Sequence, residues 1–148
     1  MTKISLVIML LTFTTSSFVQ ASFNIPSHVF TMSQLKTAQK VAKNNKKPIA
    51  FILSDKNTDC GLATAASKDI FNGLKNHSII VYVQSGKDWD KLPAIVKSGM
   101  SSSESGKYIP KTIVVNSSLK NIICILPYAK TKQRRKLIKQ AQSVISRH

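Results

Sequence analysis

Cys60 has the position in this chain best suited to chemistry. It follows a short apolar segment, Pro48 to Leu53, and a polar turn, and it opens a predicted helix that starts Cys60-Gly61-Leu62-Ala63. The unpaired backbone N–H groups and the positive end of the helix dipole stabilise a thiolate at such a position. A thiolate there attacks a disulfide and forms a mixed disulfide. The pattern therefore points to thiol–disulfide exchange, with a vestigial thiol that no longer does redox work and an intermolecular disulfide as the alternatives.

The second half of a redox pair is missing from this segment. Ala63 stands where a C-x-x-C pair would end, so release of a mixed disulfide from Cys60 would need an external thiol, or Cys124. Cys124 lies within the apolar run Ile122 to Leu126, where a free cysteine behaves as a small hydrophobe. We expect Cys124 to be a core thiol, with a Cys60–Cys124 disulfide as the alternative.

The chain is strongly basic. It carries 22 Lys and Arg against 6 Asp and Glu, a formal net charge of +16, and no acidic residue follows Glu104. The sharpest basic cluster consists of Lys130, Lys132, Arg134, Arg135 and Lys136. Most of these cations fall in the first turns of the predicted last helix, where they oppose the helix dipole. This placement suggests an anionic surface or polymer as a partner, with a solvated charged face as the alternative. Aromatic residues for base stacking are not interleaved with the cluster, so we expect no specific nucleic-acid binding.

Residues 1–21 have the pattern of a secretory signal peptide. Lys3 precedes an apolar stretch from Ile4 to Thr14, and Val19-Gln20-Ala21 resembles a small-residue cleavage site. We expect a periplasmic or secreted protein after cleavage, with a retained N-terminal anchor as the alternative. Later segments fall short of the roughly 20 apolar residues that a membrane span needs, so an integral membrane protein is not expected. The residues after the predicted signal peptide divide into a lead-in segment at 22–33 and one domain at 34–148.

Hydrophobic periodicity predicts an alternating α/β order for this domain. The expected elements, in chain order, are a helix at 34–45, a strand at 48–54, the helix that carries Cys60, a strand at 78–84, a further helix, strands at 108–115 and 121–126, and a helix at 131–146. Thr58 or Asp59 is expected to cap the Cys60 helix. Asp90 is expected to cap the next helix, with Pro93 in its first turn. Helical crossovers imply parallel strands, and the final strand pair adds an antiparallel hairpin. The lead-in could add an edge strand. We therefore expect an α/β sandwich of three layers with a mixed sheet.

This order and three local patterns resemble the thioredoxin-like superfamily. An amphipathic helix ends in Asn-Lys-Lys-Pro before an apolar strand, Cys60 takes the place of the family's attacking cysteine, and Ile109-Pro110 looks like its cis-proline site. The resemblance covers residues 34–146. It implies a thioredoxin-like fold, a catalytic Cys60, a substrate groove shaped by Ile109 and Pro110, and no cofactor. The chain departs from the family at Asp59, where an aromatic residue is usual, and at Ala63, where the resolving cysteine is lost.

Two functions remain open at this point. The first is an exported monothiol oxidoreductase or isomerase that acts on or binds thiols and disulfides of other exported proteins. The second is a non-catalytic binding or assembly module whose contact surface is the Ile109-Pro110 groove or the basic helix. Cys60-Gly61-Leu62 is also similar to the start of the glutathione peroxidase cysteine loop, but that family's later Gln and Trp motifs have no counterpart here. The three histidines and two cysteines show no zinc spacing, so no metal is expected.

Overall fold

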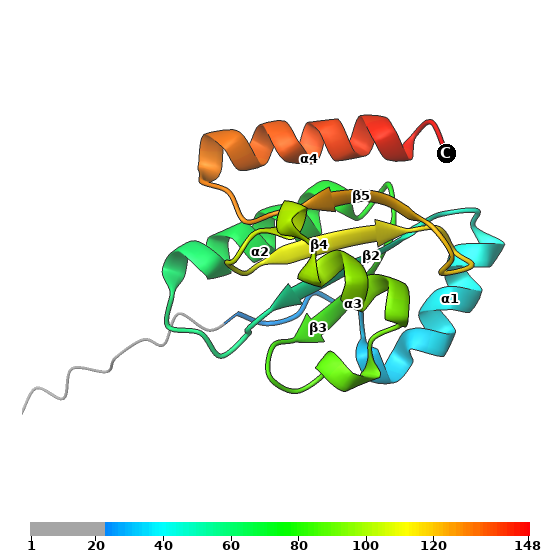
Figure 1. Cartoon of the computed structure of the whole chain (residues 1–148), viewed down its shortest axis with the longest axis horizontal. Coiled ribbons are helices and arrows are strands. Elements are labelled where there is room, and N and C mark those ends of the chain that lie inside the picture. The colour runs from blue at the N-terminus through cyan, green and yellow to red at the C-terminus, as the bar shows by residue number, and fades with distance from the viewer. Residues whose placement is uncertain (1–22) are drawn as a thin grey trace, which may run out of the picture.

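The computed structural model describes residues 23–148, so the predicted signal peptide lies outside the described residues. Figure 1 shows a mixed sheet between two layers of helices. Its strands are β1 (Val29–Thr31), β2 (Ile49–Ser54), β3 (Ile79–Gln84), β4 (Lys111–Val115) and β5 (Ile122–Leu126). They are arranged in the order β1-β3-β2-β4-β5, with β1, β3 and β2 parallel and β4 and β5 antiparallel to their neighbours. The predicted sandwich, its terminal hairpin and an edge strand from the lead-in are confirmed.

Helices cover both faces of this sheet. Those of the described chain are α1 (Leu35–Asn44), α2 (Gly61–Leu74), α3 (Ala94–Ser101) and α4 (Thr131–Ile145), with short 3-10 turns at Met32–Gln34, Trp89–Lys91 and Ser103–Ser105. Buried residues of α1 and α3 share one hydrophobic core, and those of α2 and α4 share a second core. Figure 1 shows α2 and α4 on one side of the sheet and α1 and α3 on the other side, so the two cores lie on opposite faces.

The central strand β2 contributes to both cores. Ala50 and Ile52 pack in the core of α2 and α4, whereas Ile49, Phe51 and Leu53 pack in the core of α1 and α3. This alternation follows from the two-residue period of a strand. A strand that is covered by helices on both faces needs apolar residues at every position, which explains the unbroken apolar run in the sequence.

The start of α3 differs from the prediction. Asp90 lies in the 3-10 turn Trp89–Lys91, and the residue that caps α3 is Pro93. Leu92 has an extended backbone, with φ −68° and ψ 140°. A proline disfavours the helical conformation of the residue before it, so a continuous helix cannot run through Leu92 into Pro93. The prediction that Asp90 caps this helix is therefore wrong.

α2 and α4 approach each other closely at Gly73. A Cβ atom on Gly73 would lie 2.5 Å from Cγ2 of Ile138 on α4. The side-chain amide of Gln142 also donates a hydrogen bond of 2.7 Å to the Gly73 carbonyl oxygen. On the same interface, the guanidinium of Arg134 donates two hydrogen bonds to Asp69 Oδ2, at 2.9 and 2.7 Å. The absence of a side chain at Gly73 is thus what allows α4 to lie on α2.

Gly73→Ala is expected to lower the free energy of unfolding by about 1–2 kcal/mol, because the added methyl overlaps Ile138 in a packed core. Helix propensity alone would favour alanine by about 1 kcal/mol. Urea denaturation measures the difference. Gly61→Ala is the control, since a Cβ there meets nothing within 4 Å. A Gly73→Ala protein that is more stable than the unchanged protein, by the roughly 1 kcal/mol of helix propensity, would contradict the close approach.

Candidate functional site

Three strands meet at one end of the sheet. Ser54, the last residue of β2, pairs with Gln84, the last residue of β3, and Lys111 at the start of β4 pairs one position before Ser54. The segment that leads to Cys60 and the segment Ile109-Pro110 that leads into β4 therefore lie at the same end, where α2 begins (Figure 1). The Ile109–Pro110 peptide bond is cis, as the resemblance implies.

Cys60 is itself the N-cap residue of α2. Its backbone is extended, with φ −80° and ψ 101°. Its amide donates to Thr58 Oγ1 at 3.1 Å, and its carbonyl oxygen accepts from the Thr64 amide at 3.1 Å. The residue is exposed, and among the described residues its side chain makes no capping hydrogen bond. Thr58 and Asp59 are therefore not the cap, which corrects the prediction, and Cys60 directly precedes the unpaired N–H groups of the helix.

The residues after Cys60 differ sharply in exposure. Leu62 is 68% exposed, whereas Ala63 is 5% exposed and faces the core. A resolving cysteine would take the place of Ala63, one turn along the helix. This position instead holds a methyl group packed in the protein interior, so Cys60 has no thiol partner on its own helix.

The turn between β2 and Cys60 is held to β3 by Tyr82. The Tyr82 hydroxyl accepts a hydrogen bond of 2.8 Å from the Lys56 amide and donates one of 2.5 Å to Gln84 Oε1. The Gln84 side-chain amide in turn donates to Asp55 Oδ1 at 2.8 Å. Burial raises the pKa of Tyr82 from 10.0 to about 12. This partly buried network fixes Asp55 and Lys56, two successive residues of the turn that carries the thiol.

Asp88 supports the same end of β3. Burial opposes the ionisation of Asp88. Hydrogen bonds from the Lys91 ammonium at 2.8 Å and the Gln84 backbone amide at 3.0 Å outweigh this effect, so the pKa of Asp88 is lowered. Each of these bonds joins Asp88 to a residue three or four positions away. Asp88 therefore acts as a turn residue.

Two exposed apolar side chains flank the reactive segments in the sequence. Tyr108 is 71% exposed and lies edge-on to Tyr128, with ring centroids 6.2 Å apart. It directly precedes Ile109-Pro110, and the exposed Leu62 follows Cys60 by two residues. The sequence analysis did not single out Leu62 or Tyr108 as site residues. Their adjacency to the reactive segments was the available signal.

Cys124 lies away from this end. It is paired with Val114 in the middle of β5 and packs, half-buried, against the core of α2 and α4. Burial raises the pKa of Cys124 to about 11. β5 is two strands from β2, a separation of about 10 Å at the usual strand spacing, which exceeds the reach of a disulfide. In the described chain both cysteines are free, so the alternative of a Cys60–Cys124 disulfide is wrong.

The structure divides the predicted basic cluster. Its exposed members are Lys130, Lys132, Arg135 and Lys136. Arg134 is 6% exposed and points inward, donating to Asp69 and, at 2.8 Å, to the Ala129 carbonyl oxygen. The prediction that Arg134 belongs to the basic surface is wrong, because its charge is used in the ion pair that joins α4 to α2.

No protein-family model and no curated protein matches this chain. Among solved structures, it is similar to the crystal structure of a disulphide isomerase from Xylella fastidiosa Temecula1. The TM-score is 0.53 with 16% sequence identity, over 85% of this chain and 96% of that chain. This likeness shows the fold alone, which is the thioredoxin-like fold expected from the sequence. Among residues 23–148, no helix is both long and apolar enough to cross a membrane.

The two cysteines are expected to react at very different rates in the native protein. Cys60 is exposed, whereas a thiol with a pKa of about 11 is ionised, at pH 7.5, in on the order of one molecule in several thousand. Alkylation by iodoacetamide, followed by intact mass in Cys60→Ser and Cys124→Ala, measures each thiol separately. Denaturation in urea should bring the two rates together. Equal native rates would contradict the placement of Cys124.

The Tyr82 hydroxyl makes a pH-dependent contribution to stability. The pKa of the phenol is 10.0 in the unfolded chain and about 12 in the folded protein. The contribution of this group to the free energy of unfolding is therefore fully present below pH 10 and is lost between pH 10 and 12, by about 2–3 kcal/mol. Tyr82→Phe is expected to cost about 1–2 kcal/mol at neutral pH, since the Lys56 amide loses the closer of its two acceptors, and to remove this component of the alkaline slope. Chemical denaturation across pH 8–12 tests both effects. The exposed Tyr108→Phe should keep the original slope, and an identical slope in Tyr82→Phe would overturn the assignment.

Proposed function

We propose that this chain is an exported protein that rearranges disulfides of other exported proteins through Cys60. The observation that carries the proposal is an exposed cysteine at the N-terminus of α2, at the same end of the sheet as the Ile109-Pro110 segment. Because Cys60 is exposed, its sulfur is accessible to a substrate disulfide, and attack by a thiolate on such a disulfide is the first step of exchange. The signal-peptide pattern in residues 1–21 supports export, and disulfides persist in exported proteins.

Isomerisation suits a site with a single thiol. The Cys60 thiolate attacks one sulfur of a substrate disulfide, which forms a Cys60–substrate disulfide and releases the other substrate sulfur as a thiolate. A different thiolate of the substrate then attacks the substrate sulfur of that bond, forms a new substrate disulfide and expels the Cys60 thiolate. The number of disulfides is unchanged, so the cycle needs neither an external oxidant nor a second cysteine at Ala63.

The surroundings of Cys60 suit an extended polypeptide substrate. The backbone of Ile109 precedes β4 at the same sheet end and offers strand-like hydrogen bonding to a peptide, next to Pro110. The exposed Leu62 and the Tyr108–Tyr128 pair supply apolar contacts for side chains of that peptide. A partly unfolded protein, whose apolar residues and disulfides are both accessible, combines these features.

The alternative function is a binding module without catalysis. The observation that favours it is the methyl group of Ala63, buried where a resolving thiol would be needed for net oxidation or reduction. In that case the Ile109-Pro110 segment would bind peptides, and Cys60 would take no part in turnover.

Recovery of ribonuclease activity from scrambled ribonuclease A tests the proposal. The protein spanning residues 22–148 should accelerate recovery, Cys124→Ala should retain this activity, and Cys60→Ser should fall at least tenfold, to the uncatalysed rate. Ala63→Cys is a second variant, expected to add reductase activity because the introduced thiol can release the mixed disulfide by forming an intramolecular disulfide with Cys60. Activity that survives in Cys60→Ser would overturn the role of Cys60. Absent activity in every form, with peptide binding retained, would favour the binding module.

A further inference from the structure

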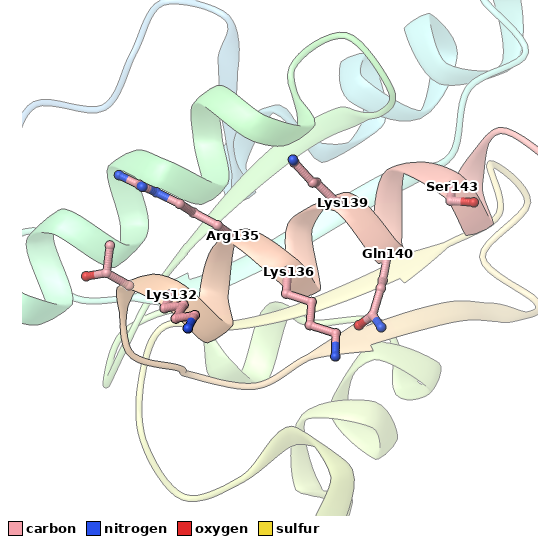
Figure 2. A pocket seen from close by; sticks show the side chains of 7 residues that line it. Lys132, Arg135, Lys136, Lys139, Gln140 and Ser143 are labelled. Carbon is pink, nitrogen blue, oxygen red and sulfur yellow. The ribbon is translucent and has the colours of Figure 1, made fainter.

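One side of α4 is buried and the other side is cationic. The buried residues, Arg134, Ile138, Ala141 and Ile145, recur every three or four positions and face α2 and the sheet. We use the term cationic face for Lys132, Arg135, Lys136 and Lys139, which recur at the same spacing on the exposed side. Figure 2 shows these four side chains projecting from α4 together with Gln140 and Ser143. A single helix therefore presents four positive charges over two turns.

The shape of this face indicates the size of its ligand. A hollow of about 740 Å³ lies along α4, and all of its lining residues come from that helix, from Thr131 to Ser143. Side chains from one helix cannot enclose a small molecule. Because α4 forms the outside of its layer (Figure 1), the face is instead accessible along its length to a broad, flat partner.

The charges of the cationic face are not neutralised within the described residues. The ion pairs found there are Lys91–Asp88 and Arg134–Asp69, and neither includes a member of the face. The sequence has no acidic residue after Glu104, so α4 carries no negative side chain. Lys132 also lies in the first turn, where a cation opposes the helix dipole. This arrangement disfavours the isolated helix and favours contact with an anionic partner.

We propose that the cationic face binds the anionic headgroups of a phospholipid bilayer. The residues that line the hollow are all charged or polar, so the contact is electrostatic and peripheral, without insertion of apolar side chains. A bilayer matches the flat, open geometry better than a small anion does. The face offers no aromatic ring on which nucleic-acid bases could stack.

Docking through α4 leaves the thiol end accessible. Arg134, in the first turn of α4, contacts Asp69, in the third turn of α2, so the N-terminus of α2 extends beyond that of α4. Cys60 lies at this extending end. A protein held by its cationic face would therefore still present the thiol to partners beside the membrane.

Co-sedimentation with vesicles tests this proposal. The protein spanning residues 22–148 is mixed with vesicles of 30% phosphatidylglycerol in phosphatidylcholine, and with pure phosphatidylcholine as the neutral control. The test variant is Lys132→Gln, Lys136→Gln and Lys139→Gln together. The matched control is Lys36→Gln, Lys40→Gln and Lys43→Gln, which removes the same charge from exposed positions of α1 on the opposite face of the sheet. Circular dichroism verifies that both variants fold.

The unchanged protein is expected to bind the anionic vesicles, and 0.5 M NaCl should release it because salt screens such contacts. Each lysine near an anionic surface contributes roughly fivefold in affinity, so the α4 variant should bind on the order of a hundredfold more weakly. A loss at least tenfold greater than in the α1 variant supports the proposal. A smaller difference between the variants overturns it, since net charge would then account for binding. The proposal is also overturned if the unchanged protein does not bind the vesicles. This holds even if the protein binds heparin, a soluble polyanion, through α4.

Discussion

β2 pairs with β3 on one side and with β4 on the other, and every one of its residues is buried. These two pairings determine where the reactive segments of the chain end. The parallel pairing brings the end of β3 beside the end of β2, and the antiparallel pairing brings the start of β4 to the same place. Cys60 and Ile109-Pro110 are 49 residues apart in sequence, yet they share one end of the sheet because both are attached to strands that pair through β2. A change of register in β2 would move its side chains to the opposite cores and separate these segments.

Local patterns in the sequence were sufficient for most of the fold. The unbroken apolar run of β2 and the helical spacing of α4 each reflect the faces that those elements bury, so periodicity identified them. The position of Cys60 at a helix start could be predicted for the same reason. The prediction placed Pro93 in the first turn of α3, whereas Pro93 is the N-cap residue and the helix begins at Ala94. A proline disfavours the helical conformation of the residue before it, so the helix could not start earlier.

Long-range contacts could not be predicted in this way. In the sequence Arg134 is one cation among several, but its partner Asp69 is 65 residues earlier in the chain. Tyr82 lies within an apolar strand, and its hydroxyl accepts a hydrogen bond from the amide of Lys56, 26 residues away. Neither partner is encoded in local spacing, since both contacts exist only after the helices and strands have packed. The same contacts determine which cations remain exposed and how firmly the thiol-bearing turn is held.

The extension of α2 beyond α4 has a consequence for local motion. The later turns of α2 are tied to α4 by the Asp69–Arg134 pair and by the close packing at Gly73. The first turn, with Gly61 and Leu62 exposed, has no such support from α4. Parts of a fold with few tertiary contacts open at lower free energy than the fold as a whole. Residues 60–62 can therefore fray at lower free energy, while α2 from the buried Ala63 onward, the sheet and both cores keep their structure.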